Sequence, residues 1–290
     1  MPNGIIIIDK PQEWTSMDVC AKLRGILKEK RIGHAGTLDP MATGVLPVFV
    51  GRATRAVEFA DKGEKEYVAG LKLGLVTNTQ DTSGEILEQH PVQVTQEQLE
   101  SVLSRFRGDI LQIPPMFSAI KINGKKLYEL ARKGREVERP ARPVTIHSLT
   151  VEEQLAPDEF VLRIRCSKGT YVRTLCHDIG TALGCGGCMS SLRRTMAAGF
   201  TLEHSVTLEQ LMGAEDPAAA LLPVDAYFSD RPDLRLNADL EKKVRNGMTV
   251  VLPGVTDGEY RVYGLESGEF LALCRAEKGK LITIKSFFQV

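Results

Sequence analysis

The sequence predicts an α+β protein with a small β domain at its C-terminal end. Residues 67–73 and 160–166 alternate apolar and polar side chains at the period of a strand. Residues 95–106 repeat apolar side chains at helical spacing behind a Thr95/Gln98 capping box. From about residue 229, glycine-containing turns separate short β-like runs, which is typical of a small barrel or sandwich. We therefore expect one domain over residues 1–228 and a second over residues 229–290.

The composition is that of an ordinary globular protein. Of its 290 residues, 43% are hydrophobic and 26% are charged, and the 37 basic residues balance 37 acidic ones. Zero net charge argues against a generic nucleic-acid coat protein but leaves room for a local basic patch. No apolar run approaches the ~20 residues of a membrane helix, and residues 5–8 are too short for a signal peptide. We expect a cytoplasmic protein.

The cysteines are expected to be free, packed thiols. Cys185 and Cys188 have the spacing of half a zinc site, and Cys176 and His177 lie nearby in sequence. No second regularly spaced pair completes the site, so we expect no structural metal. The six cysteines are Cys20, Cys166, Cys176, Cys185, Cys188 and Cys274.

The N-terminal segment predicts a buried strand over residues 4–8 and then a helix with a Thr15/Asp18 capping box. This helix has an apolar face for the core. Its other face and its end bring positive charge towards the stretch that follows, from Lys22, Arg24, Lys28, Lys30 and Arg31.

That stretch, residues 33–47, is rich in glycine and proline and has a single carboxylate, Asp39. Glycine and proline at this density fix a backbone path in place of a regular element, and Pro40 biases Asp39 away from helical geometry. A β-like run over residues 45–50 follows. Asp39 is thus either a turn-forming residue or a carboxylate held for chemistry on a tight loop.

The residues of this loop favour the second interpretation. The string Gly-His-Ala-Gly-Thr-Leu-Asp-Pro-Met-Ala-Thr-Gly-Val-Leu-Pro resembles the catalytic motif of the TruB family of tRNA pseudouridine synthases. The resemblance makes Asp39 the catalytic carboxylate, and gives His34 the role of filling the space that a flipped base vacates. It implies a pseudouridine synthase fold, with a mixed, largely antiparallel sheet, flanking helices and a central cleft that holds Asp39. The tail is similar, in texture only, to the PUA-like RNA-binding domain of this family.

Further motifs extend the resemblance to the remaining site residues. Lys65-Glu66-Tyr67 resembles the second motif, whose Tyr packs against the target base. The string from Lys168 to Arg173 resembles the third, whose Arg pairs with the catalytic Asp, and Leu192 lies in a segment that contacts the base. Without the resemblance, Tyr67 is an ordinary strand aromatic and Arg173 a solvated helix residue. With it, the expected catalytic residues are Asp39, Tyr67 and Arg173, and the expected substrate-binding residues are His34, Tyr67, Tyr171, Leu192, Lys10 and Lys168.

Residues 118–143, called the arm below, contain eight basic and three acidic side chains, an excess of +5 in a chain of zero net charge. Few of them can form a core, so we expect a mobile, phosphate-seeking insertion with a short helix over residues 125–133. It resembles the thumb of the TruB family. The expected contacts to the RNA backbone are Lys121, Lys125, Lys126, Arg132 and Arg142.

The function implied by the resemblance is conversion of uridine 55 in the TψC loop of tRNA to pseudouridine. The reaction is an isomerisation, for which no redox cofactor, ATP or metal is expected. We expect a monomer without an obligate protein partner. A non-catalytic RNA-binding or RNA-folding protein and the guide-dependent branch of the same family are the alternatives. The sequence leaves open whether Asp39 attacks C1′ or C6 or abstracts the 2′ proton.

Overall fold

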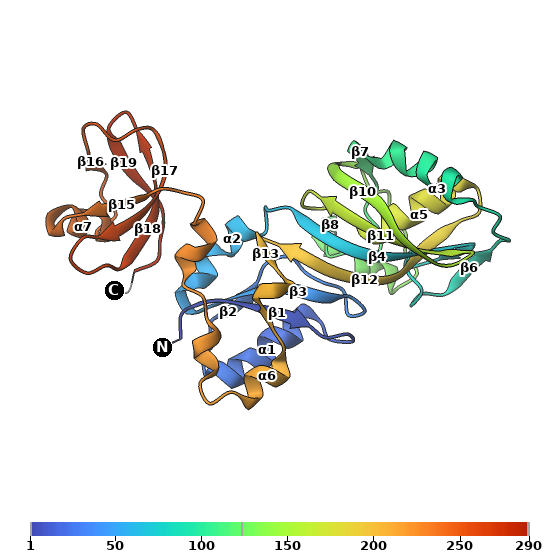
Figure 1. Cartoon of the computed structure of the whole chain (residues 1–290), viewed down its shortest axis with the longest axis horizontal. Helices are drawn as coiled ribbons and strands as arrows, with labels where there is room; N and C mark the ends of the chain where they lie inside the picture. The colour runs from blue at the N-terminus through green and yellow to red at the C-terminus, as the bar shows by residue number, and fades with distance from the viewer. Residues whose placement is uncertain (1, 123, 289–290) are drawn as a thin grey trace.

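Ten strands form one continuous sheet, along which the rest of the first domain is arranged (Figure 1). The computed structural model describes residues 2–122 and 124–288. Only the pairs β1/β14 and β3/β12 are parallel, so the sheet is mixed and largely antiparallel, as predicted. The main path is β14 (Ser205–Val206), β1 (Gly4–Lys10), β3 (Thr43–Val50), β12 (Gly187–Ala197), β4 (Lys65–Leu73), β11 (Glu159–Cys166), β10 (Arg142–Ala156) and β7 (Gly108–Gln112), with β2 (Ile32–His34) on β3 and β13 (Phe200–Thr201) on β12.

The sheet divides into two halves where β3 meets β12. Their parallel pairing joins only Thr43 and Gly44 to Arg193 and Arg194, so the halves share a short seam. Helices α1 (Ser16–Leu27) and α6 (Leu208–Gly213) pack on the first half. Helices α3 (Gln96–Leu103) and α5 (Val172–Leu183) pack on the second half. The loop that carries Asp39 connects β2 to β3 and therefore lies beside the seam.

Strand β1 is apolar at consecutive positions because both of its faces are covered. Ile6 and Ile8 pack into the core beneath α1 and α6. Ile5 and Ile7 point to the other face, into a cluster that also contains residues of the C-terminal domain. A strand buried on both faces explains the continuous run that the sequence shows at residues 5–8.

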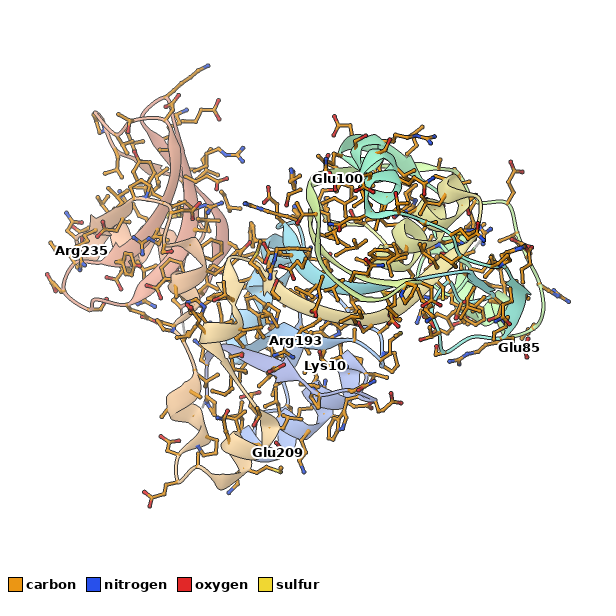
Figure 2. The ribbon with its side chains drawn as sticks, turned by 45° about the vertical axis from the view of Figure 1, so that its right-hand side comes forward. Lys10, Glu85, Glu100, Arg193, Glu209 and Arg235 are labelled. Atoms are coloured by element: carbon orange, nitrogen blue, oxygen red, sulfur yellow. The ribbon has the colours of Figure 1, made fainter. Side chains whose placement is uncertain are left out.

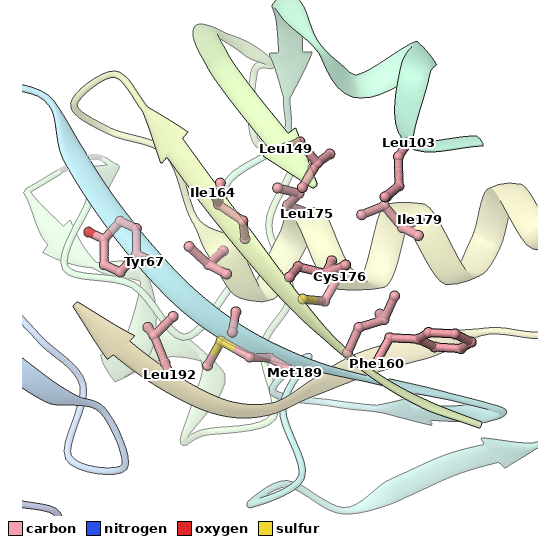
Figure 3. Close-up of a cluster of buried hydrophobic side chains, with 14 of the residues drawn as sticks. Tyr67, Leu103, Leu149, Phe160, Ile164, Leu175, Cys176, Ile179, Met189 and Leu192 are labelled. Atoms are coloured by element: carbon pink, nitrogen blue, oxygen red, sulfur yellow. The ribbon is translucent and has the colours of Figure 1, made fainter. Parts of the chain in front are cut away.

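The local signals read from the sequence are present in the structure. Thr15 caps α1 with Asp18, and Thr95 caps α3 with Gln98, each as a reciprocal capping box. The alternating strands β4 and β11 send their apolar side chains into one core, part of which is drawn in Figure 3. All six cysteines are free and buried. No helix in the described part of the chain is long and apolar enough to span a membrane.

The arm begins as a small hairpin and then forms a helix shorter than predicted. Strands β8 (Lys121–Ile122) and β9 (Lys125–Lys126) pair, and α4 covers only Leu127–Ala131. The prediction of a helix from residue 125 is wrong at its start, because Lys125 and Lys126 use their backbone in the hairpin. Leu127 is fully buried and fixes the base of the arm, whereas most of its charged side chains are exposed.

The C-terminal domain has a sheet and a core of its own. It is also docked on the first domain: Phe228 packs its ring 5.8 Å from that of Phe287, and Arg55 donates to Ser286 Oγ at 2.8 Å. The sheet order is β15 (Asp233–Leu236), β17 (Gly258–Gly264), β18 (Phe270–Glu277), β19 (Lys280–Ser286) and β16 (Val250–Val251), with α7 (Ala238–Arg245) packed on it. The remaining elements are η1 (Gly51–Ala56), α2 (Val57–Ala60), β5 (Leu75–Thr77), β6 (Ile86–Gln89), η2 (Ser104–Phe106), η3 (Leu202–His204), η4 (Pro217–Ala220) and η5 (Val224–Phe228).

The seam supplies a stability prediction at Gly44. Its φ is +101°, and a Cβ there would lie 2.2 Å from the carbonyl oxygen of Arg194. Gly44→Ala should therefore lower the free energy of unfolding by about 3 kcal/mol or more. Gly25→Ala is the matched control: Gly25 is an exposed helix residue with open space around it, and its replacement should raise stability by about 0.5–1 kcal/mol. Urea unfolding of both variants tests this, and a Gly44→Ala protein as stable as wild type would contradict it.

Candidate active site

The Asp39 loop is anchored by its apolar residues and leaves its carboxylate accessible. Leu38 and Ala42 are buried in the core of the second half of the sheet. The hydroxyl of Ser16 accepts from Leu38 N at 2.9 Å and donates to Leu38 O at 3.2 Å. Between these anchors the side chain of Asp39 is 41% exposed. The loop thus holds a reachable carboxylate on a fixed backbone.

Lys10 also stabilises this loop, through hydrogen bonds from its ammonium group to backbone carbonyls. Its fully buried ammonium donates to the carbonyls of Pro11 at 2.9 Å, Trp14 at 2.6 Å and Pro40 at 3.2 Å. Burial lowers the pKa of Lys10 to about 8, while the nearby Asp39 carboxylate acts in the other direction. The family resemblance predicts that Lys10 binds substrate. All three of its donors are engaged by the protein, so the structure makes it a support of the loop, and a substrate contact stays a prediction.

Arg194 holds the two flanks of the loop together. The residue is only 1% exposed, and its guanidinium donates from Nε to Val45 O at 2.7 Å and from Nη2 to Gly36 O at 2.9 Å. Lys65 has the same character: it is buried and donates to the carbonyls of Asp61 and Gly63, each at 2.8 Å. Neither residue was assigned a role in the site from the sequence, because the burial of a cation cannot be recognised there.

Arg173 connects Asp39 to two other parts of the site. Its Nε lies 3.0 Å from Asp39 Oδ2, its Nη1 donates to Thr79 O at 3.0 Å, and its Nη2 donates to Phe117 O at 2.9 Å. Arg173 is buried as the second residue of α5. The planar guanidinium of Arg173 therefore links three segments: the Asp39 loop, the turn after β5 and the residue before the arm.

Asp81 is a second carboxylate on this guanidinium, although its sequence context indicates only a turn. It is buried, and its Oδ2 lies 3.7 Å from Nη1 of Arg173. Its Oδ1 accepts from Thr79 Oγ1 at 2.8 Å and from Ser83 N at 3.0 Å. The turn chemistry of residues 78–84 was the available signal, but its partner lies far away in sequence.

Tyr67 and Leu192 form an apolar surface that continues into the core. Figure 3 shows both at one end of the buried cluster, with the Tyr67 hydroxyl directed away from Phe160. Tyr67 is only 8% exposed. Burial raises the pKa of its hydroxyl, and the Arg194 guanidinium opposes that shift.

His34 and Lys168 line a shared open pocket of about 690 Å³, which also includes Thr37 of the Asp39 loop and Lys285 of the C-terminal domain. The Nδ1 atom of His34 is buried and has no hydrogen-bond partner among the described residues. Burial lowers the pKa of His34, and the Arg194 charge adds to this, so its neutral form is favoured.

Tyr171 precedes α5, and the side chain of Gln112 holds its backbone with bonds of 2.8 and 3.0 Å. Among the arm residues proposed to touch RNA, Lys126 is half-buried with its ammonium 5.3 Å from the centre of the Tyr128 ring. Lys121, Lys125, Arg132 and Arg142 are exposed. Within residues 2–122 and 124–288, no group of three or more His, Cys, Asp or Glu side chains could hold a metal ion.

Most of the chain is similar to family models and to known proteins. Residues 24–172 match the family model of the TruB family pseudouridylate synthase N-terminal domain, and residues 173–229 match that of the tRNA pseudouridylate synthase B C-terminal domain. The chain is similar to tRNA pseudouridine synthase B of Ralstonia pickettii (strain 12J), at 45% identity over 91% of this chain and 85% of the relative. It is similar to the same-named protein of Azoarcus sp. (strain BH72), at 44% identity over 96% of this chain and 93% of the relative.

Two solved structures of multi-component complexes are also similar to this chain. A Cbf5-Nop10-Gar1 complex matches with a TM-score of 0.73 and 28% identity, covering 98% of this chain and 85% of that chain. An H/ACA RNP bound to a substrate RNA containing 2′-deoxyuridine matches with a TM-score of 0.72 and 26% identity, covering 99% of this chain and 85% of that chain.

The contacts of the Arg173 guanidinium predict that its removal destabilises the protein. Arg173→Met leaves Asp81 buried without its cation, and the free energy of unfolding should fall by about 3 kcal/mol or more. Arg165→Met is the matched control, since its guanidinium is 52% exposed and pairs with Glu64 at the surface, so that the loss should be ~1 kcal/mol or less. Urea unfolding compares the two. Equal losses would mean that Arg173 is no more than another surface ion pair.

Proposed function

The chain belongs to the TruB family of pseudouridylate synthases, and from this premise we propose that it isomerises uridine to pseudouridine in tRNA, with Asp39 as the catalytic carboxylate. One observation carries the assignment of Asp39. It is a half-exposed carboxylate on a loop fixed by buried cations, 3.0 Å from the buried guanidinium of Arg173. The similar proteins at 44–45% identity are named for this reaction.

The chemistry suits a carboxylate in this position. The reaction breaks the N1–C1′ bond of a uridine, turns the base and joins C5 to C1′. A carboxylate can attack carbon and later leave, or it can take a proton. Attack of Asp39 at C1′, attack at C6, and abstraction of the 2′ proton are all compatible with its exposure. Arg173 orients the carboxylate through its contact with Oδ2.

The other site residues receive their roles from the same proposal. The target base must leave its stack, which costs a few kcal/mol. We assign to Tyr67 and Leu192 the apolar surface on which the base lies, and to His34 the filling of the space that the base vacates. Lys168 and Tyr171 contact substrate at the edge of the site. Lys10 acts through the loop that it supports.

The proposal extends to the whole chain. Residues 1–228 form the catalytic domain, with the arm as its inserted RNA-binding thumb, and residues 229–290 form a PUA-like RNA-binding domain. Exposed cations on the arm suit contact with RNA phosphates. A cytoplasmic location, monomeric action without an obligate protein partner, and position 55 of the TψC loop as the target belong to this proposal.

We keep guide-dependent action as the second candidate, because the similar solved structures are of an H/ACA RNP and of a Cbf5-Nop10-Gar1 complex, in which the similar chain is part of a larger assembly. Their identity of 26–28% is well below that of the tRNA pseudouridine synthase B relatives, which favours tRNA as substrate. The test is to incubate the purified chain alone with an unmodified tRNA transcript. We expect pseudouridine at position 55, and none when that uridine is replaced by cytidine. Product only after addition of guide RNA and protein partners would favour the second candidate.

Asp39→Asn should abolish turnover and leave tRNA binding close to normal. The amide keeps the shape of the side chain but is a poor nucleophile and a poor base, whereas most affinity comes from phosphate contacts elsewhere. Asp158→Asn is the matched control, since Asp158 forms a surface ion pair with Lys72 at 2.9 Å and should keep its turnover. Single-turnover rates and filter binding, measured in parallel, decide the matter. A folded Asp39→Asn protein with near-normal turnover would remove Asp39 from the mechanism.

The arm should contribute salt-dependent affinity. Lys125→Ala and Lys126→Ala should each reduce the slope of log K against log salt by about 0.7–0.9 for every RNA phosphate that the replaced ammonium neutralises. Arg105→Ala removes an exposed cation outside the arm and should change the slope less. Equilibrium binding of wild type and of each variant to tRNA, across a range of salt concentrations, gives the slopes. An unchanged slope in the double variant of Lys125 and Lys126 would exclude these residues as phosphate contacts.

A further inference from the structure

Arg194 is a buried charge without an acidic partner. Its side chain is among the largest that are fully buried, and no described carboxylate lies within 4.0 Å of its guanidinium. The hydrogen bonds that its guanidinium donates go to the carbonyls of Val45 and Gly36. A buried charge is costly unless a nearby group compensates it. Arg173 differs, because it has both Asp39 and Asp81.

The register of the sheet brings a second group to Arg194. In the antiparallel pair of β12 and β4, Arg194 lies directly opposite Tyr67. Directly opposed side chains lie on the same face with their Cβ atoms about 4.5–5.5 Å apart. The Tyr67 ring is buried, and the charge of the Arg194 guanidinium lowers the pKa of the Tyr67 hydroxyl against the larger raising effect of burial. One cation thus faces the Asp39 loop and the Tyr67 hydroxyl together.

We propose that Arg194 is a positioning residue with two functions: it clamps the flanks of the Asp39 loop, and it stabilises the phenolate of Tyr67 as the acceptor of the C5 proton. This rests on the proposed function. Once C5 has joined C1′, the C5–H bond breaks and its proton moves to the Tyr67 oxygen. The electron pair of that bond restores the C5–C6 double bond, and the π pair of the C6–N1 double bond moves to N1. N1 takes a proton from water and Tyr67 later returns its own to water, so no net proton is gained or lost. Arg194 keeps its charge throughout.

Of the charges around Arg194 and Tyr67, that of Arg194 is the one that favours the Tyr67 phenolate most. Burial raises the pKa of Tyr67, and Cys166 and Asp39 act in the same direction, so that a phenolate there needs a cation. Arg194 supplies it, and its removal should raise the pKa of Tyr67 further. The titratable groups that face the pair from neighbouring elements are Lys10, His34, Asp39, Asp61, Lys65 and Cys166.

The test separates the two functions with two substitutions. Arg194→Met removes the charge and keeps an apolar side chain, and Arg194→Lys keeps a charge but cannot reach both loop carbonyls as a fork. Arg193→Met is the matched control, because its guanidinium is the neighbouring one on β12 and pairs with Asp9 at 2.8 Å instead. A fluorinated tyrosine at position 67, which is a stronger acid, reports the titration of this one side chain by fluorine NMR. Single-turnover rates on tRNA are measured across pH with unmodified Tyr67.

We expect the Tyr67 titration of folded Arg194→Met to move to higher pH by about one unit or more. Its rate should fall about tenfold further at neutral pH than at alkaline pH, because less phenolate is present. Arg194→Lys should keep the titration near that of wild type and lose rate equally at all pH values. Arg193→Met should leave the titration in place.

Three results would overturn the inference. The first is a Tyr67 titration that is the same in wild type and Arg194→Met, and the second is an Arg194→Met rate loss that does not depend on pH. The third is a wild-type Tyr67 that stays neutral until the protein unfolds. The NMR titration needs no substrate, so it tests Arg194 even if tRNA proves not to be the substrate. Absence of pseudouridine in wild-type assays would count against the proposed function alone.

Discussion

Hydrogen bonds from buried cations to backbone carbonyls are the constraint on which this site depends. Lys10 and Arg194 contact the Asp39 loop in this way from β1 and β12. A loop of glycines and prolines has few regular hydrogen bonds of its own, so its carbonyls need donors from elsewhere. Cations serve as donors and, at the same time, give the loop a positive surrounding. The carboxylate can therefore be exposed and still be held in one place.

The position of the site follows from the sheet. The short parallel contact of β3 and β12 joins two halves that each have a core, and Gly44 allows the two backbones to approach there. Strand β12 passes this contact and carries both Leu192 and Arg194 (the adjacent Arg193 and Lys10 are labelled in Figure 2). Residues from β1, β2, β4, β12 and α5 thus reach one region, although they are spread over most of the sequence.

The sequence could predict those features that depend on a few neighbouring residues or on a family motif. Capping at Thr15 and Thr95 is a signal over four residues, and strand alternation at Tyr67 is a signal over seven. The ion pair of Asp39 with Arg173 was expected from the resemblance alone, and it is present at 3.0 Å. The pairing of Asp81 with Arg173 and the burial of Arg194 could not be predicted, because both depend on contacts between residues about 90 to 160 positions apart. The catalytic and binding roles of the site residues stay predictions.

The docking of the C-terminal domain has a consequence for how the chain folds. Phe228, Phe270 and Phe287 pack in the cluster that also contains Ile5 and Ile7 of β1 (Figure 1 shows this domain beside α2). The two domains therefore share one solvent-excluded interior at this point, and their stabilities are thermodynamically coupled. A chain cut after residue 228 would present an aromatic face to water, so the tail covers the first strand of the N-terminal domain as well as forming a separate β fold.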